Sequence, residues 1–148
     1  MNNQIYNLLL ADDDEDDCDF FKDALDELSL AATLIIVNDG VELMNYLASN
    51  PDNLPDILFL DLNMPRKNGH ECLREIRAID ALKDLPVAIF STSLDTEIVD
   101  LMYEKGATYY IRKPGDYSKL KKVIENTLIT AYENNFKKPA RADFILQP

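Results

Sequence analysis

Five short apolar segments, separated by longer amphipathic ones, constrain the fold of this chain more than any other feature. The apolar segments are 5–11 (IYNLLLA), 32–37 (ATLIIV), 56–60 (DILFL), 86–90 (PVAIF) and 107–111 (ATYYI). They carry almost no charge and are bounded by turn or acidic residues, which is typical of strands that are buried on both faces of a sheet. The sequence therefore predicts five buried strands.

Between these strands, apolar residues recur at spacings of three and four, as they do along one face of a helix. The longest such stretch begins near Asp116 and runs to about Asn134, and Pro139 prevents the helix from continuing. Shorter stretches are marked by Phe21, Leu25 and Leu28; by Leu43, Met44 and Leu47; by Leu73, Ile76 and Ile79; and by Ile98, Leu101 and Met102. Strands and helices that alternate five times predict a parallel sheet with helices on both faces.

The length and the net charge of the chain exclude several classes of protein. The 148 residues fit one domain with a substantial core. The net charge of −12, from 27 acidic and 15 basic residues, argues against binding to nucleic acid or anionic lipid, which both need clustered positive charge. The sequence shows no signal peptide and no apolar stretch of membrane-spanning length, so we expect a cytoplasmic protein whose cysteines, Cys18 and Cys72, are reduced packing residues.

Four of the five predicted strands end in residues whose side chains can bind ions or take part in a reaction. These residues are Asp12 and Asp13, Asp61, Ser91 and Lys113. In open parallel sheets, ligands bind outside the carboxyl ends of the strands, so these side chains are expected to converge on one cleft. Three carboxylates in one cleft raise one another's pKa or require a cation. Mg²⁺ suits this set, with the backbone carbonyl of Asn63 as a further oxygen ligand.

The same arrangement suits Asp61 to nucleophilic attack on phosphorus, which would form an aspartyl phosphate. Lys113 would neutralise the phosphoryl oxygens as a compact point charge, and the Ser91 hydroxyl would hydrogen-bond one of them. The remaining acids of the run, residues 14–17, are expected to open a solvated helix, where the helix dipole favours negative charge.

Four motifs, LLLADDD, FLDLNMPRKNG, PVAIFSTS and GATYYIRKP, together resemble the receiver domain of two-component response regulators over roughly residues 5–134. The resemblance implies a flavodoxin-like (βα)5 fold, in which an α/β doubly wound five-stranded parallel sheet has the order 2-1-3-4-5. It also implies that residues 1–135 form a CheY-like receiver domain. Residues 136–148 would then be a C-terminal tail, with no output domain.

The resemblance also implies roles for the acidic residues. Asp61 matches the phosphoacceptor of the family. Asp13 matches the acid that ligates Mg²⁺ directly, and Asp12 matches the acid that usually contacts the ion through water. The backbone carbonyl of Asn63 matches the third protein ligand.

Three further positions match the switch apparatus of the family. Ser91 matches the hydroxyl residue that moves towards the phosphoryl group on activation. Tyr110 matches the switch aromatic that responds to that movement. Lys113 matches the lysine that contacts the phosphate, and its bond to Pro114 is typically cis in the family.

A protein of this kind is a phosphoacceptor switch, not an enzyme, although it promotes its own phosphorylation and dephosphorylation. The resemblance implies that a sensor histidine kinase donates the phosphoryl group. The signal would pass to an unknown downstream protein through the face of the fourth helix, fifth strand and fifth helix. A narrower similarity to regulators paired with phytochrome-type kinases leaves a homodimer open. For the tail, two alternatives stand: disorder, or docking of Phe144, Ile145 and Leu146 on a second protomer.

Three other functions compete with this interpretation. A phosphatase or dehalogenase-type hydrolase also uses an aspartate nucleophile and Mg²⁺, but its nucleophile loop carries a second acid where this chain has Asn63. A flavin carrier with the same sheet order needs hydroxyls and glycines after its first strand, where this chain has acids. A degenerate receiver that only scaffolds is disfavoured by the intact Asp12, Asp13, Asp61 and Lys113.

Overall fold

The computed structural model describes residues 5–148, so the first four residues of the expected receiver domain lie outside it. The strands are β1 (Ile5–Ala11), β2 (Ala31–Val37), β3 (Ile57–Leu60), β4 (Val87–Ser91), β5 (Tyr109–Arg112) and β6 (Ile145–Leu146). The helices are α1 (Glu15–Asp26), α2 (Gly40–Ser49), α3 (Gly69–Ala78), α4 (Thr96–Glu104), α5 (Tyr117–Glu133) and a 3-10 turn at Arg141–Asp143. The first ten elements alternate as the sequence predicts.

All neighbouring strands of the sheet run parallel, in the order β2-β1-β3-β4-β5-β6. The predicted flavodoxin-like order is confirmed for the first five strands. The predicted number of strands is wrong, because the chain returns after α5 and adds β6 beside β5. Tyr110 pairs with Ile145 in this register, and its backbone N–H donates to the carbonyl of Phe144 at 3.0 Å.

The C-terminal tail therefore matches neither alternative that the sequence left open. Phe144 is fully buried, with its ring 5.0 Å from that of Tyr103 and 6.3 Å from that of Tyr110. Arg141 forms an ion pair with Asp100 on α4 at 2.8 Å, which links the 3-10 turn before Phe144 to that helix. The three apolar residues of the tail thus pack on the sheet and helix of their own chain, where they bury apolar surface without a second protomer.

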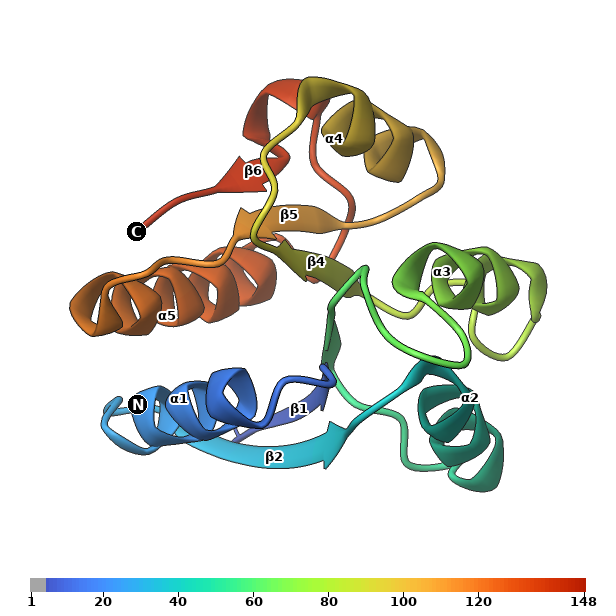
Figure 1. The fold of residues 1–148 in the computed structure, drawn as a ribbon, viewed down its shortest axis with the longest axis horizontal. Coiled ribbons are helices and arrows are strands. Elements are labelled where there is room, and N and C mark those ends of the chain that lie inside the picture. Colours follow the sequence, from blue (N-terminus) through green and yellow to red (C-terminus); the bar gives the residue numbers. More distant parts are fainter. Residues whose placement is uncertain (1–4) are drawn as a thin grey trace.

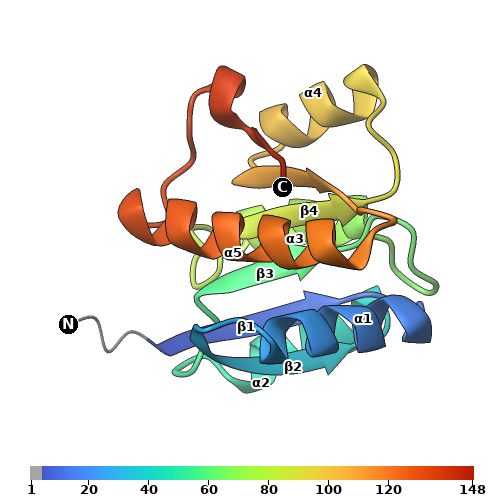
Figure 2. The ribbon, with the colours of Figure 1, turned by 90° about the vertical axis from the view of Figure 1, so that its left-hand side faces the viewer.

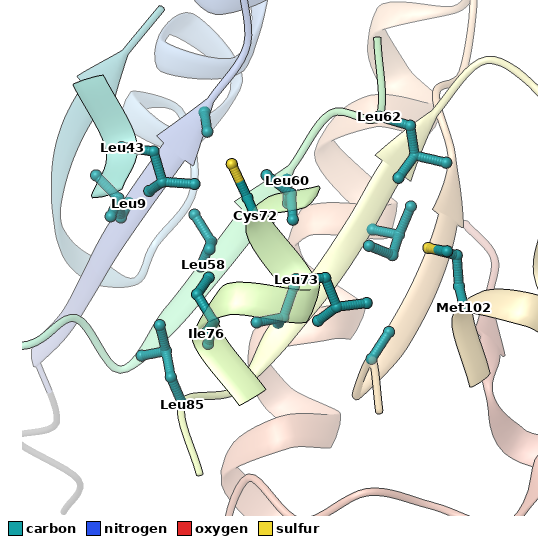
Figure 3. Packing of buried hydrophobic residues seen from close by; sticks show 14 of the residues in the cluster. Leu9, Leu43, Leu58, Leu60, Leu62, Cys72, Leu73, Ile76, Leu85 and Met102 are labelled. Carbon is teal, nitrogen blue, oxygen red and sulfur yellow. The ribbon is translucent and has the colours of Figure 1, made fainter. Parts of the chain in front are cut away.

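Helices cover both faces of the sheet (Figures 1 and 2). On one face, α1 and α5 pack against residues such as Leu8, Phe59 and Phe90. On the other face, α2, α3 and α4 enclose a second cluster, which includes Leu9, Leu58, Leu60, Leu73 and Met102 (Figure 3). Within the described residues, no helix combines the length and apolar character needed to cross a bilayer.

The two cysteines lie in different clusters. Cys18 on α1 belongs to the cluster on one face of the sheet, and Cys72 on α3 belongs to the cluster on the other face. Both thiols are free and buried. Because both side chains are buried in apolar clusters, their predicted role as packing residues is confirmed. The sheet lies between the two thiols.

Each helix from α1 to α5 begins at an acidic or amide side chain that accepts a backbone N–H of the first turn. The capping residues are Asp14, Asp39, Asn68, Asp95 and Asp116. Such caps fix where a helix starts. Because every one of these helices follows the carboxyl end of a strand, their positive ends gather at the edge of the sheet that carries the predicted site.

Candidate functional site

The parallel register brings the predicted strand-end residues to one edge of the sheet. Ala11 pairs with Leu60, so the residues that follow them, Asp12 and Asp61, leave adjacent strands at the same level. The backbone N–H of Asp61 donates to the carbonyl of Ala11 at 3.0 Å. On the other side, the N–H of Lys113 donates to the carbonyl of Ser91 at 2.7 Å.

Three carboxylates meet at this edge. Oxygens of Asp12, Asp13 and Asp61 all lie within 4.8 Å of one another. Asp12 is fully buried, Asp61 is 6% exposed and Asp13 faces solvent. Burial raises the pKa of Asp61 to about 6, and the charges of Asp12 and Asp13 push it the same way while Lys113 opposes the rise.

The carboxylate cluster has the chemistry of a divalent metal site. Hard cations such as Mg²⁺ prefer oxygen ligands, and a cation at this position would offset the mutual repulsion of the three carboxylates. The backbone N–H of Asn63 donates to Oδ1 of Asp61 at 3.4 Å, so the loop after β3 folds back beside the carboxylate. The assignment of the Asn63 carbonyl as a ligand stays a prediction.

Glycine permits the close packing that supports Asp61. A Cβ atom at Gly69, the first residue of α3, would lie 2.3 Å from the backbone carbonyl oxygen of Asp61. The N–H of Gly69 donates to the carbonyl of Leu62 at 3.0 Å. The start of α3 is therefore pressed against the loop that holds the candidate phosphoacceptor, in a position that a larger residue would disturb.

Lys113 provides the positive charge of the site. Its ammonium lies 2.8 Å from Oδ2 of Asp12, 2.9 Å from Oδ2 of Asp17 and 3.7 Å from Oδ2 of Asp61. The side chain is 10% exposed, and the ammonium lies 5.5 Å from the centre of the Phe90 ring. Burial alone would lower the pKa of Lys113, but hydrogen bonds with Asp12 and Asp17 outweigh it and the pKa is raised.

One expected feature of this lysine is not found. No peptide bond among residues 5–148 is cis, so the cis bond to Pro114 implied by the resemblance is wrong for this structure. The trans form is intrinsically favoured at X–Pro bonds. With that bond trans, the Lys113 ammonium lies within 3.7 Å of carboxylate oxygens of Asp12, Asp17 and Asp61.

Ser91 ends β4, and Tyr110 lies on the neighbouring strand β5. The buried Ser91 hydroxyl accepts the N–H of Ser93 at 3.2 Å, and the Tyr110 phenol donates to the carbonyl of Ser93 at 2.7 Å. Burial raises the pKa of Tyr110, and a hydrogen bond with Ser91 partly offsets the rise. Both side chains thus engage the loop between β4 and α4, and their predicted roles in switching remain predictions.

Asp17 is the residue that sequence reasoning missed. The run 14–17 was predicted to be a solvated helix start, yet Asp14 caps α1 and Asp17 binds Lys113. A signal for this was available. Asp17 precedes Phe21 by four residues and Leu25 by eight, which places it one turn beyond the buried stripe of its helix.

Comparison with known proteins agrees with this geometry. The family model of the response regulator receiver domain matches residues 8–125. Response regulator Rcp1 of Synechocystis sp. is 30% identical over 122 residues, which cover 80% of this chain and 83% of that protein.

Solved structures agree as well. The phosphorylated cyanobacterial phytochrome response regulator RcpA superposes with a TM-score of 0.79 at 28% identity, covering 93% of this chain and 100% of that one. The Mn²⁺-bound form of response regulator Rcp1 gives a TM-score of 0.76 at 28% identity, covering 91% and 99%. The family match spans most of the chain, and the chain covers 83% of Rcp1 and 100% of RcpA. The chain therefore belongs to the response regulator receiver domain family, whose members are phosphorylation-switched signalling proteins.

Proposed function

We propose that Asp61 accepts a phosphoryl group from a phosphohistidine of a sensor histidine kinase, in a reaction that requires Mg²⁺. The single observation that supports this most is the convergence of Asp12, Asp13 and Lys113 on the nearly buried Asp61. A carboxylate oxygen of Asp61 attacks phosphorus, the bond from phosphorus to the imidazole nitrogen breaks, and the imidazole leaves with the electron pair.

The residues around Asp61 have separate tasks in this reaction. Asp12, Asp13 and the carbonyl of Asn63 would hold Mg²⁺, which shields the negative charge of the incoming phosphoryl group. Lys113 lies 3.7 Å from Asp61 and is placed to neutralise a phosphoryl oxygen. The Ser91 hydroxyl is the donor proposed to hydrogen-bond another of these oxygens.

Phosphorylation would then shift the population of two arrangements of Ser91 and Tyr110. Tyr110 lies fully buried beneath Phe144 of the tail. The surface that a downstream protein reads would therefore comprise α4, β6 and α5, with β6 covering β5. We propose this route of signalling for a cytoplasmic protein, and we further propose that the receiver promotes its own dephosphorylation.

Phosphorylation by a small acyl phosphate and Mg²⁺, followed by intact mass spectrometry, tests this function. One base-labile phosphoryl adduct is expected, and it should vanish in Asp61→Asn or with a chelator. Asp52→Asn, the same change at an exposed site, should label like the wild type. Repeated turnover of the donor without an adduct would indicate a hydrolase, and a failure to label even with cognate kinases would indicate a scaffold.

A further inference from the structure

The ammonium of Lys113 lies nearer to two other acids than to the candidate phosphoacceptor. It is 2.8 Å from Asp12 and 2.9 Å from Asp17, but 3.7 Å from Asp61. Asp12 belongs to the carboxylate cluster, whereas Asp17 comes from the first turn of α1. The proposed function gives Asp17 no task, although it is paired with Lys113, which provides positive charge at the site.

The backbone that carries Asp17 is held in place by its surroundings. The backbone N–H of Asp17 donates to Oδ1 of the capping residue Asp14 at 3.0 Å. The next residue, Cys18, is buried, and its thiol donates to the backbone carbonyl of Asp12 at 3.4 Å. Phe21, one turn later, is fully buried in the core. The first turn of α1 is thus fixed relative to the end of β1.

The ion pair differs from the surface pairs that contribute little to stability. The Lys113 side chain is 10% exposed, and its ammonium lies over the Phe90 ring. The side chain of Asp17 is 36% exposed. Because water screens the partly buried lysine only in part, the interaction between the two charges is stronger than that of a solvated pair.

We propose that Asp17 is a positioning residue that draws the Lys113 ammonium away from Asp61, so that phosphorylation requires the lysine to weaken its bond with Asp17. This inference rests on the proposed function. A phosphoryl group adds negative charge and acceptor oxygens beside Lys113. The lysine turns towards these oxygens, and the Asp17 carboxylate loses part of its counter-charge. Asp17 therefore disfavours the phosphorylated state and links that state to the first turn of α1.

Beryllofluoride, a non-covalent mimic of the phosphoryl group, provides the test. Its affinity for the full chain in Mg²⁺ is measured by ¹⁹F NMR titration, which does not depend on turnover. Asp17→Asn removes the competing charge, so it should bind beryllofluoride about three- to tenfold more tightly. Asp17→Ser should show the same gain, whereas Asp17→Glu keeps the charge and should stay near the wild type.

The matched control is Asp16→Asn, which removes the same charge from an exposed residue of the same helical turn. It should leave the beryllofluoride affinity within about twofold of the wild type. The side-chain ¹⁵N signal of Lys113, recorded without beryllofluoride, should move in Asp17→Asn and stay in Asp16→Asn.

Several outcomes would overturn the inference. An equal gain in the two asparagine variants would mean that only net charge matters. An unchanged or weaker affinity in Asp17→Asn would mean that Asp17 does not hold the lysine back. Failure of the proposed function looks different, because the wild type would then bind no beryllofluoride and Asp61→Asn would change nothing.

Discussion

The rings of Phe144 and Tyr110 lie 6.3 Å apart, both fully buried, and the backbone of one residue is hydrogen-bonded to that of the other. A residue close to the C-terminus thereby covers the aromatic side chain that belongs to the proposed switch. This contact joins the tail, through Tyr110, to the loop that contains Ser93 and follows the candidate site residue Ser91. The tail is part of the core on this face of the sheet.

Loss of the Phe144 ring should destabilise the protein. Phe144→Ala removes a fully buried ring and leaves a cavity beside Tyr103 and Tyr110, which should lower the free energy of unfolding by about 3 kcal/mol. Urea titration monitored by circular dichroism measures the change. Phe20→Ala, at a residue that is 54% exposed, is the control and should lower the free energy of unfolding far less. Equal effects of the two substitutions would show that the tail does not pack stably in solution.

The pKa of Asp61 predicts how stability depends on pH when divalent metal is absent. Because the pKa is raised to about 6 in the folded protein, the folded state holds the Asp61 proton more tightly than the unfolded state. The stabilisation that the bound Asp61 proton gives to the folded state is fully present below about pH 4, and it is lost as the pH rises through 6. At pH 8 with a chelator, Asp61→Asn should therefore be more stable than the wild type, by on the order of 1–2 kcal/mol.

The gain should disappear at pH 4, where the wild-type carboxyl is protonated, and it should shrink in excess Mg²⁺, which binds the wild-type carboxylates. Urea unfolding at the two pH values, with and without Mg²⁺, provides the measurement. Asp52→Asn, the same change at an exposed site, is the control variant. A gain of equal size at both pH values would refute the assignment of the effect to the Asp61 proton.

Divalent metal binding should depend on the exposed member of the cluster. Asp13→Ala removes one of three converging carboxylates, so we expect at least a tenfold loss of Mg²⁺ affinity and loss of Mg²⁺-dependent labelling of Asp61. Isothermal titration calorimetry measures the affinity, and mass spectrometry measures the labelling. Asp19→Ala, at an exposed position on α1, is the matched control. Unchanged labelling of Asp13→Ala would exclude Asp13 as a required ligand.

A methyl group at the start of α3 should disturb the site. The Cβ of Gly69→Ala would lie 2.3 Å from the carbonyl oxygen of Asp61, so the helix or the loop must shift. We expect slower labelling of Asp61 and a loss of about 1–3 kcal/mol in stability. Gly115→Ala is the control, since no atom lies within 4 Å of a Cβ built there. Full activity of Gly69→Ala would show that the loop adapts without cost.

Most of the sheet and the site could be predicted because the signals are local. Strand β3 is an uninterrupted apolar run, β1 is uncharged and ends in four buried apolar residues, and the acids Asp12, Asp13 and Asp61 follow these strands directly. Once the sheet is parallel, its geometry brings these acids together. The convergence of acids and lysine therefore followed from strand order and the ends of the strands.

The features that were missed depend on contacts between distant segments. Strand β6 has two residues, and its conformation comes from pairing with β5, more than thirty residues earlier, so no periodicity announces it. The partnership of Asp17 with Lys113 spans 96 positions. The helical spacing places Asp17, and not Asp16, in line with Phe21 and Leu25, but only the folded position of Lys113 shows which cation Asp17 binds.

The position of β6 also affects how the molecule meets its neighbours. Without it, β5 would end the sheet with a row of unpaired N–H and carbonyl groups, which is a template for addition of a strand from another molecule. Pairing with Ile145 and Leu146 occupies part of that row, and the new border is a strand of two residues. An edge strand of two residues has few free backbone N–H and carbonyl groups with which an incoming strand could pair. The tail thereby protects the protein against edge-to-edge aggregation on this side of the sheet.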